Sequence, residues 1–339
     1  MESFSVLLVG CGNIAGGYDL LQAEDDLPLG HAKAFAKHGG FTLAACVEPN
    51  SARRAEFQQR WNVADGFSSM KELVDQACYF DVISICSPTH SHAVDIEFAL
   101  TLKPKLIFCE KPVTLSLTET DYIVKACAAQ GILLAVNYSR RWSPEVLQIK
   151  AELTDGEWGR VRSVSASYNK GILNNGSHMI DMLHFLFGSL QIISVGHPVN
   201  DFFSDDPTVD VSLRTDQRVP ILINVAHAND YTLFEMQIVT EKGVINMEDG
   251  GARWRFRNAS PSNKLSGYSF LNMGEWITPK GSYALTGAVS NLFDTLKKEE
   301  PLASTGTNAL QAQSVCERIK QMAMKHVASQ INEKENYER

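Results

Sequence analysis

A lysine followed by a proline, Lys111-Pro112, stands directly after a short apolar run at 106–108 and the pair Cys109-Glu110. The run has the length and composition of a buried strand, so we expect the lysine where a parallel strand ends. Ligands of open α/β sheets bind outside these strand ends. A lysine there loses part of its solvation, which makes it suitable for acid–base chemistry. The alternative is a surface lysine before a turn, and the neighbouring motifs favour the catalytic interpretation.

The amino terminus carries a glycine-rich pattern typical of dinucleotide-binding loops. Directly after an apolar run, Gly10, Gly12 and Ala15 occupy the G-x-G-x-x-G/A fingerprint, with Asn13 and Ile14 between the last two. The first glycine permits a tight turn, and the second lets the backbone approach a pyrophosphate. The small third residue lets a following helix pack against the strand, with its amino-terminal end facing the phosphates. The pattern alone is weak, and the strands and helices that follow strengthen it.

Apolar runs typical of strands alternate with amphipathic helical patterns in the first part of the chain. We expect strands at 4–9, 41–48, 81–87, 105–109 and 132–137. We expect helices at 31–37, 51–61, 68–77, 91–102 and 117–130. This alternation predicts an α/β fold with a parallel sheet covered on both faces, a Rossmann domain at residues 1–138.

The second half has a different pattern, in which few helices interrupt the strands. Strand-like runs occur at 161–168, 191–196, 209–214, 219–227, 233–240, 243–247 and 252–258. They predict an α+β domain at residues 139–330 with a large open, mostly antiparallel sheet. Closing helices are expected at 283–298 and 308–330, and residues 331–339 are expected to fray.

The end of the second predicted strand indicates which cofactor is bound. Glu48 can accept hydrogen bonds from the adenosine ribose of NAD, and it repels the 2′-phosphate of NADP. It lies further from the last glycine than the usual spacing of about 20 residues, and we attribute the excess to an insertion at 17–30. Arg53 and Arg54 follow and can instead bind a 2′-phosphate. The sequence therefore favours NAD, with NADP as the alternative.

Several motifs in order along the chain resemble those of the Gfo/Idh/MocA family, which includes glucose–fructose oxidoreductase and inositol dehydrogenase. They are the segments 10–15, 87–92 (Ser-Pro-Thr-His-Ser-His), 110–112 (Glu-Lys-Pro), 140–144 and 176–181. Together they span essentially the whole chain. The resemblance implies cofactor contacts at Ser87, Pro88, His92, Glu110, Lys111 and Arg141. It also implies that subunits pair through the open sheet as a homodimer or homotetramer.

The resemblance implies a catalytic set of Lys111, Asn174 and His178. Many dehydrogenases of the family have an aspartate four residues before the histidine, where this chain has Asn174. An amide can bind a sugar hydroxyl but cannot take its proton. The implied function is hydride transfer between nicotinamide and a hydroxyl or keto carbon of a sugar, nucleotide sugar or polyol, with Lys111 or His178 moving the proton.

Two alternatives stay open at this point. Because Asn174 leaves the set incomplete, the chain can be a non-catalytic NAD(P)-binding sensor or regulatory protein of the same fold. It can also be a reductase of a diketo-sugar or a biliverdin-like conjugated substrate, which needs less base catalysis.

Composition limits the classes of protein and partner. The 339 residues, 44% hydrophobic and 21% charged, are ordinary for a globular protein of two domains. A net charge of −8 argues against binding nucleic acid. We expect no membrane span and no signal peptide, and the seven cysteines lack framework spacing, which indicates a reducing cytoplasm. His178, Asp181 and His184 spread too widely around a helix for a metal site, so none is expected.

Two further expectations concern local geometry. The resemblance predicts a cis Lys111-Pro112 peptide, a form that X-Pro bonds adopt in only about 5–6% of cases. The insertion at 17–30 and the stretch at 261–280 are the expected specificity loops. In them Tyr18, Asp19 and Trp276 can bind or stack on a sugar, or can simply pack the loops.

Overall fold

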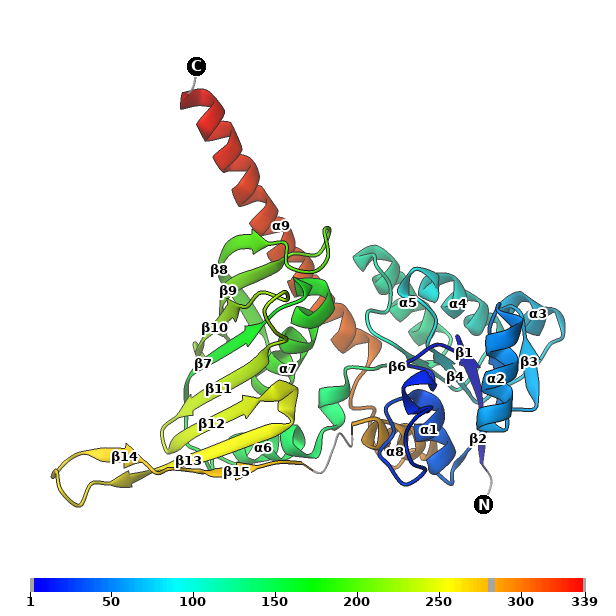
Figure 1. Cartoon of the computed structure of the whole chain (residues 1–339), viewed down its shortest axis with the longest axis horizontal. Helices are drawn as coiled ribbons and strands as arrows, with labels where there is room; N and C mark the ends of the chain where they lie inside the picture. Colours follow the sequence, from blue (N-terminus) through cyan, green and yellow to red (C-terminus); the bar gives the residue numbers. More distant parts are fainter. Residues whose placement is uncertain (1–2, 280–283, 338–339) are drawn as a thin grey trace. The chain divides into compact units, whose positions relative to one another are not determined.

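The computed structural model describes residues 3–279 and 284–337, with side chains as far as Lys325, and it divides into two compact units (Figure 1). The first unit comprises Met1–Pro144 and Ser282–Gln311, and the second comprises Glu145–Gly281 and Ala312–Arg339. This division differs from the predicted domains 1–138 and 139–330, because the helix α8, Ala284–Lys297, belongs to the first unit.

Apolar packing explains why α8 lies in the first unit. Leu285, Ala288, Val289 and Leu292 are buried in one cluster with Val6, Phe35, Val82, Leu106 and Phe108. The helix thus covers the sheet of the first unit with the face that its spacing of apolar residues creates. Tyr283, where the sequence places the start of this helix, lies outside the described residues.

The first unit contains a six-stranded parallel sheet in the order β3-β2-β1-β4-β5-β6. The strands are β1 Phe4–Val9, β2 Phe41–Val47, β3 Asp65–Phe67, β4 Val82–Ile85, β5 Leu106–Cys109 and β6 Leu133–Val136. The helices are α1 His31–Lys37, α2 Ser51–Trp61, α3 Met70–Asp75, α4 Thr89–Leu102 and α5 Leu117–Ala129, with 3₁₀ turns η1 Gly17–Asp19 and η2 Ser139–Trp142. The strand order reverses between β1 and β4, so the ligand-binding crevice of this fold is expected there.

Local sequence signals begin the helices of this unit. The side chains of Asn50, Ser69 and Ser116 accept hydrogen bonds from backbone N–H groups three residues later, and these bonds cap α2, α3 and α5. Buried aliphatic residues fill the central strands; in β4 and β5 every residue is buried. These strands are therefore covered on both faces, as the continuous apolar runs predict.

The second unit contains a large mixed sheet in the order β14-β13-β12-β11-β7-β10-β9-β8, with β15 paired to β13. Its strands are β7 Val161–Tyr168, β8 Leu190–Val199, β9 Thr208–Thr215, β10 Pro220–Val225, β11 Phe234–Thr240, β12 Gly243–Glu248, β13 Arg253–Pro261, β14 Ser269–Leu271 and β15 Glu275–Ile277. Strand pairing is antiparallel except between β7 and β10. The predicted mostly antiparallel sheet is confirmed.

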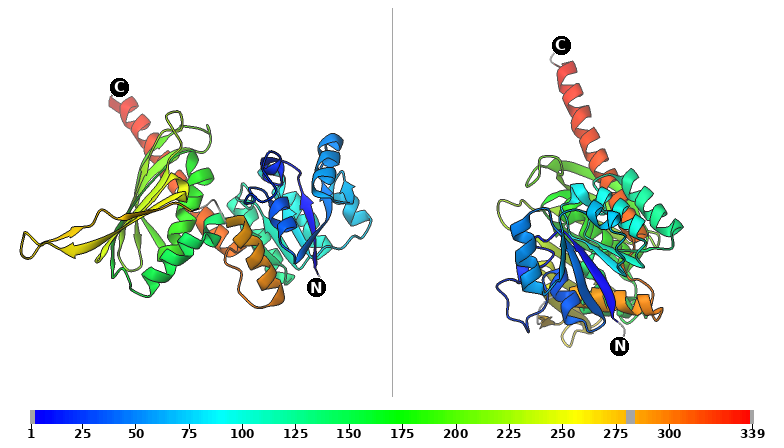
Figure 2. Two further views of the ribbon diagram at one scale, coloured as in Figure 1. Left: turned by 60° about the horizontal axis from the view of Figure 1, so that its bottom comes forward. Right: turned by 90° about the vertical axis from the view of Figure 1, so that its right-hand side faces the viewer.

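Helices lie on one face of this sheet (Figures 1 and 2). They are α6 Pro144–Thr154, the wide π-helical turn η3 Gly171–Gly176, α7 Ser177–Phe187 and α9 Gly306–Tyr337, and a 3₁₀ turn η4, Asp249–Gly251, follows β12. The sequence predicts fraying after Gln330, but α9 runs on to Tyr337.

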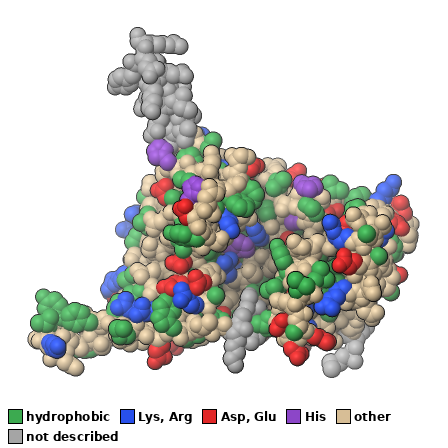
Figure 3. Space-filling model, viewed as in Figure 1, with side chains coloured by type: hydrophobic (Ala, Val, Ile, Leu, Met, Phe, Trp, Pro, Cys, Tyr) green, Lys and Arg blue, Asp and Glu red, His purple; other side chains and the backbone are tan. Residues whose placement is uncertain are grey.

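The hairpin of β13 and β14 extends beyond the body of the second unit (Figure 2). Its end is rich in hydrophobic side chains (Figure 3), among which Leu265, Tyr268, Phe270 and Met273 are exposed. In the ranges 3–279 and 284–337, no helix is both long enough and apolar enough to cross a membrane.

Candidate functional site

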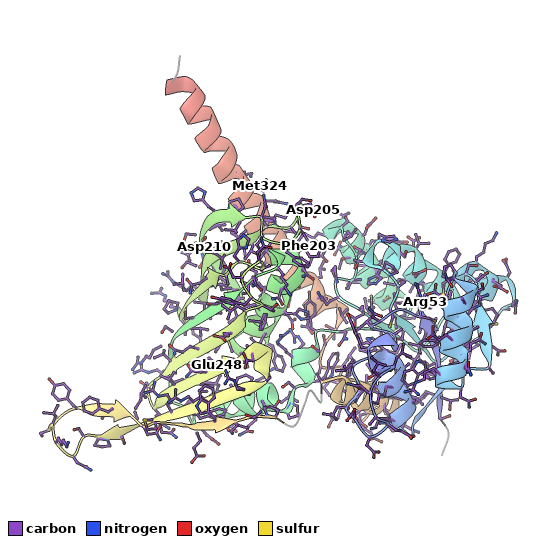
Figure 4. All side chains as sticks on the ribbon, viewed as in Figure 1. Arg53, Phe203, Asp205, Asp210, Glu248 and Met324 are labelled. Atoms are coloured by element: carbon purple, nitrogen blue, oxygen red, sulfur yellow. The ribbon has the colours of Figure 1, made fainter. Side chains whose placement is uncertain are left out.

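A cavity of about 410 Å³ opens at the carboxyl ends of β1, β2 and β4, where the strand order of the first unit reverses. Four of the residues predicted to contact the cofactor line this cavity: Gly10, Glu48, Ser87 and Pro88. The other lining side chains include Arg53, which stands on the first turn of α2 (Figure 4), as well as Lys71, His90 and Asp95.

Two glycines of the fingerprint meet different surroundings. Gly10 has φ +85°, and a Cβ there would lie 2.7 Å from the backbone N and Cα of Ser87. A Cβ on Gly12 would meet nothing within 4 Å. Gly10 is therefore needed for the close approach of the β1 and β4 loops, and Gly12 leaves open space beside the backbone, as a pyrophosphate requires.

The fingerprint does not open directly into an α-helix, and the inserted residues explain why. Turns and η1 follow it, and α1 begins only at His31, whose N–H donates to the carbonyl of Ile14. The next N–H, of Ala32, donates to the carbonyl of Ala15. The helix thus joins the fingerprint as though the insertion at 17–30 were looped out of the chain.

Asp19 closes the base of this insertion. It is fully buried, and its carboxylate accepts hydrogen bonds from the N–H groups of Leu29, at 2.9 Å, and Gly30, at 2.8 Å. Of the two alternatives for Asp19, binding a sugar or packing the loop, the buried and hydrogen-bonded carboxylate favours packing. Tyr18 is exposed, while Trp276 lies on β15 of the other unit, with the guanidinium groups of Arg253 and Arg255 each within 5.3 Å of its ring centroid.

Glu48 is buried at the end of β2 and is tied to the dinucleotide loop. Its carboxylate accepts hydrogen bonds from the N–H groups of Cys11, at 3.1 Å, and Asn50, at 3.0 Å. Arg53 approaches the same carboxylate at 3.5 Å. Glu48 thus fixes the loop conformation, and its contact with the ribose stays a prediction.

The turn after β5 carries Glu110, Lys111 and Pro112, and the predicted cis Lys111-Pro112 bond is confirmed. Glu110 accepts hydrogen bonds from Asn137 Nδ2, at 2.6 Å, and from His31 Nε2, at 2.9 Å. The second ring nitrogen of His31 lies 2.8 Å from Ser84 Oγ. A buried polar chain therefore begins at the residue before Lys111 and crosses the ends of β4, β5 and β6.

Charge on this chain follows from its contacts. Burial alone lowers the pKa of His31, but contact with Cys86 and Glu110 raises it to about 10. Burial raises the pKa of Glu110, but hydrogen bonds and charge from His31, with the amide of Asn137, bring that pKa below its ordinary value. At neutral pH the two residues form an imidazolium–carboxylate pair inside the unit.

This pair predicts a pH dependence of stability. Because the pKa of His31 rises from 6.5 to about 10 on folding, its contribution is complete below pH 6.5 and is lost progressively as the pH approaches 10. Glu110 acts in the opposite sense, since its lowered pKa gives a contribution that is lost as the pH falls through its folded-state value. Urea unfolding of the wild type and His31→Gln, measured from pH 6 to 10, should show a free-energy difference that shrinks with rising pH. A difference that stays constant would contradict the charged pair.

His92 and Ser87 lie beside the same turn. Ser87 Oγ donates to Asp95 Oδ2 at 2.6 Å. His92 is buried, with Nδ1 2.9 Å from the carbonyl oxygen of Pro112 and Nε2 2.8 Å from that of Ser87. The predicted nicotinamide-side contact of His92 stays a prediction, since its ring nitrogens are directed at backbone oxygens.

Arg141 is buried in η2, and its guanidinium donates to the carbonyl oxygen of Ala303 at 3.4 Å. The neighbouring Trp142 packs in the α8 cluster and donates from Nε1 to Asn291 Oδ1 at 3.0 Å. These contacts hold η2 to the carboxyl-terminal segment of the first unit. The predicted cofactor contact of Arg141 is untested.

Asn174 and His178 lie on consecutive turns of the second unit, at η3 and the start of α7. Asn174 Nδ2 donates to the carbonyl oxygen of Lys170 at 3.0 Å. The buried carboxylate of Asp206 accepts from the N–H groups of Leu173 and Asn174, each at 2.9 Å, and so holds this turn. Lys111 lies in the first unit, so the joining of all three residues in one site stays a prediction.

Sequence reasoning missed several of these polar residues. His31, Ser84 and Asn137 read as ordinary helix and strand positions, and Asp206 as a loop acid. The sequence does contain one signal for them. Each is a polar residue in or beside an apolar segment, and a polar side chain that is buried there needs a hydrogen-bond partner. Among the described residues, no group of three or more His, Cys, Asp and Glu side chains can hold a metal ion.

The chain is similar to known oxidoreductases. Residues 4–138 match the model of the GFO_IDH_MocA family, described as an oxidoreductase family with an NAD-binding Rossmann fold. The uncharacterized oxidoreductase YrbE of Bacillus subtilis is 46% identical over 79 residues, which are 23% of this chain and 23% of that protein. The inositol 2-dehydrogenase of Rhizobium meliloti is 23% identical over 267 residues, covering 71% of this chain and 78% of that protein. The chain therefore matches less than a quarter of the first relative and about three quarters of the second.

A solved structure shares the fold over nearly the whole chain. The WlbA dehydrogenase from Bordetella pertussis, crystallised in complex with NADH and UDP-GlcNAcA, superposes with a TM-score of 0.74 at 18% identity, covering 95% of this chain and 97% of that one. The fingerprint and the Glu-Lys-Pro turn lie within residues 4–138, so this part of the chain is similar to the Gfo/Idh/MocA family of NAD-binding oxidoreductases, and the chain as a whole shares its fold with the WlbA structure.

Proposed function

We propose that the protein is an NAD-dependent dehydrogenase or reductase that acts on a CH–OH or keto group of a sugar, nucleotide sugar or polyol. One observation carries the proposal. The Glu110-Lys111-Pro112 turn ends β5 in the same unit, and at the same end of the same sheet, as the cavity lined by Gly10, Glu48 and Ser87. A lysine there is suited to move a proton beside a bound dinucleotide.

The residues present fit a dinucleotide. Gly12 leaves room for the pyrophosphate, and the cavity of about 410 Å³ at β1, β2 and β4 suits the adenosine half. When bound, NAD supplies a hydride acceptor at C4 of its nicotinamide ring.

In the proposed oxidation, the substrate C–H bond gives its electron pair as hydride, and the hydroxyl loses its proton to Lys111 or His178. In reduction the same group returns the proton to the ketone oxygen. Asn174 donates to, or accepts from, a substrate hydroxyl and does not itself take a proton. Proton transfer therefore falls on the lysine and the histidine.

A panel of substrates tests this proposal. Inositols, aldoses and UDP-linked sugars are mixed with NAD⁺ or NADP⁺, and the nicotinamide absorbance is followed. Diketo-sugars and biliverdin, tested with NADH, cover the reductase alternative. Turnover with a sugar or polyol supports the proposal, and silence across the panel despite tight NAD binding contradicts it.

Cofactor preference gives a separate prediction. Glu48 stands in the adenosine-side cavity with Arg53 and Lys71 nearby, so the acid excludes a 2′-phosphate that the two cations would otherwise bind. Glu48→Ser should raise the affinity for NADP⁺ relative to NAD⁺ by about tenfold or more, the effect of about 1.4 kcal/mol. The exposed Glu56→Ser serves as the control. An unchanged ratio of dissociation constants would remove Glu48 from this role.

One observation favours the sensor as the second candidate. The Asn174 amide, which replaces the family aspartate, donates to the Lys170 carbonyl within its own turn. Such a residue serves local structure without any chemistry. An Asn174→Asp variant that gains turnover on the panel, where the wild type has none, would favour the sensor.

We also propose that copies of the chain pair through the open sheet of the second unit. A shallow depression of about 400 Å³ on this sheet carries both Glu235 and Glu248, the latter labelled in Figure 4, and Arg255 and Arg257. A twofold axis can place each carboxylate opposite a guanidinium. Light scattering should report a dimer or tetramer that dissociates in Arg255→Glu, and a monomeric wild type would refute the pairing.

We place the protein in the cytoplasm. All seven cysteines are unpaired thiols, and most are buried, as in proteins of reducing compartments.

A further inference from the structure

Glu110 and Pro112, the residues before and after Lys111, each contact a buried histidine, and the two histidines lie on different helices. On one side, His31 of α1 meets the Glu110 carboxylate at 2.9 Å. On the other, His92 of α4 meets the Pro112 carbonyl oxygen at 2.9 Å. The two histidines are 0% and 1% exposed, so neither contact competes with bulk water. The lysine therefore lies between two fixed points of the chain.

Several further contacts fix the ring of His31 and the carboxylate of Glu110. Its ring stacks on Phe108, with centroids 4.6 Å apart and planes 24° apart, which fixes the ring orientation. Nδ1 faces Ser84 Oγ at 2.8 Å, and Asn137 Nδ2 donates to the same Glu110 oxygen that His31 meets. His31 and Asn137 therefore hold the carboxylate of Glu110 in one position.

The His92 ring lies between two backbone oxygens. Nδ1 and Nε2 lie 2.9 and 2.8 Å from two carbonyl oxygens, those of Pro112 and Ser87. Carbonyl oxygens only accept, so a proton on Nδ1 is donated to the oxygen of Pro112. Cys109 Sγ of β5 lies 3.7 Å from the same nitrogen. The ring therefore joins the start of α4 to the turn after Lys111.

We propose that His31 and His92 are positioning residues that clamp the Glu110-Lys111-Pro112 turn from both sides and thereby aim Lys111. The inference rests on the proposed function for the role of Lys111, but not for the existence of the clamp. A lysine side chain has four torsions, so fixing its ammonium group in one place costs conformational entropy. Holding the backbone on both sides of it limits where the ammonium can go, and a misplacement of about 1 Å can cost about 10²-fold in rate.

Hydrogen exchange tests the clamp without any substrate. His31→Leu and His92→Leu each remove one contact, and we expect the amides of Glu110, Lys111, Val113 and Thr114 to exchange about tenfold faster or more in either variant, because the loop opens locally. His38→Leu is the matched control, since its ring packs on Phe41 and Phe293 away from the turn. If His31→Leu fails to fold, Glu110→Ala removes the same contact from the other side. Unchanged exchange in both positioning variants would overturn the proposal.

Kinetics supply a readout that general loosening would not produce. With the best substrate of the panel, each variant should lower kcat by about 10- to 100-fold, with the KM for NAD⁺ within about twofold. Faster exchange in the variants of a protein that turns over nothing would refute the proposed function and leave the clamp intact. A lowered kcat with unchanged exchange would refute the clamp.

Discussion

Lys111→Ala is expected to lower turnover by about 10²–10⁴-fold, the usual contribution of a positioned acid–base group. The lysine lies in the turn after β5, held between Glu110 and Pro112, and the alanine variant removes the group that would carry the proton. The affinity for NAD⁺ should change far less, because the residues that we propose bind the pyrophosphate and adenosine follow β1 and β2, away from Lys111 in the chain.

The measurement is kcat by nicotinamide absorbance, with the dissociation constant of NAD⁺ from calorimetry. Lys125→Ala is the matched control, since this lysine is 74% exposed on α5 and pairs with Asp121 in the same helix. Near-full turnover in Lys111→Ala would transfer the acid–base role to His178. A parallel loss of NAD⁺ affinity would make Lys111 a binding residue instead.

The second large effect is on thermal stability, and it distinguishes Gly10 from Gly12 in the same loop. Gly10→Ala places a methyl group 2.7 Å from the backbone of Ser87 at φ +85°, and neither the backbone nor the positive φ can adjust cheaply. We expect a loss of about 3 kcal/mol or more, and a melting temperature lower by roughly 6 °C or more. Gly12→Ala meets nothing within 4 Å, so the melting temperature should stay close to that of the wild type.

Binding then distinguishes the two variants. The methyl group of Gly12→Ala fills the space that the pyrophosphate needs, so its dissociation constant for NAD⁺ should rise about tenfold or more while the fold is intact. Thermal unfolding with and without NAD⁺ measures both effects. A stable Gly12→Ala that binds NAD⁺ as tightly as the wild type would remove the dinucleotide loop from this segment.

How far the sequence predicts the structure depends on how local the determinants are. The strands 4–9 and 161–168 and the helices 31–37 and 51–61 match the predicted bounds, because apolar spacing and caps within a few residues define them. The strand β3 was missed because Asp65-Gly66-Phe67 is too short to show alternation. The strands β14 and β15 were missed because their residues are mostly exposed, so no buried face gives them a pattern.

The residues of the candidate site likewise fall into those that local sequence predicts and those that it does not. Gly10 and Gly12 form the loop directly after β1, since short-range geometry defines that loop, and Glu48 lines the same cavity as Gly10. Their contacts with a cofactor stay predictions. The partner of Glu110 is His31, 79 residues away, and only the folded sheet brings the two together. The sequence left the role of Asp19 open for the same reason, because its burial depends on how the insertion folds back on α1.

The looped-out insertion also bears on how this protein can change over generations. Its two ends are joined at the helix by the N–H groups of His31 and Ala32, which reach the carbonyls of Ile14 and Ala15, and by Asp19. Residues between these ties can vary in number and kind without shifting His31 or the turn it holds. New ligand preferences can thus be acquired in this segment while the reaction machinery is inherited unaltered, and an engineer can graft loops there for the same reason.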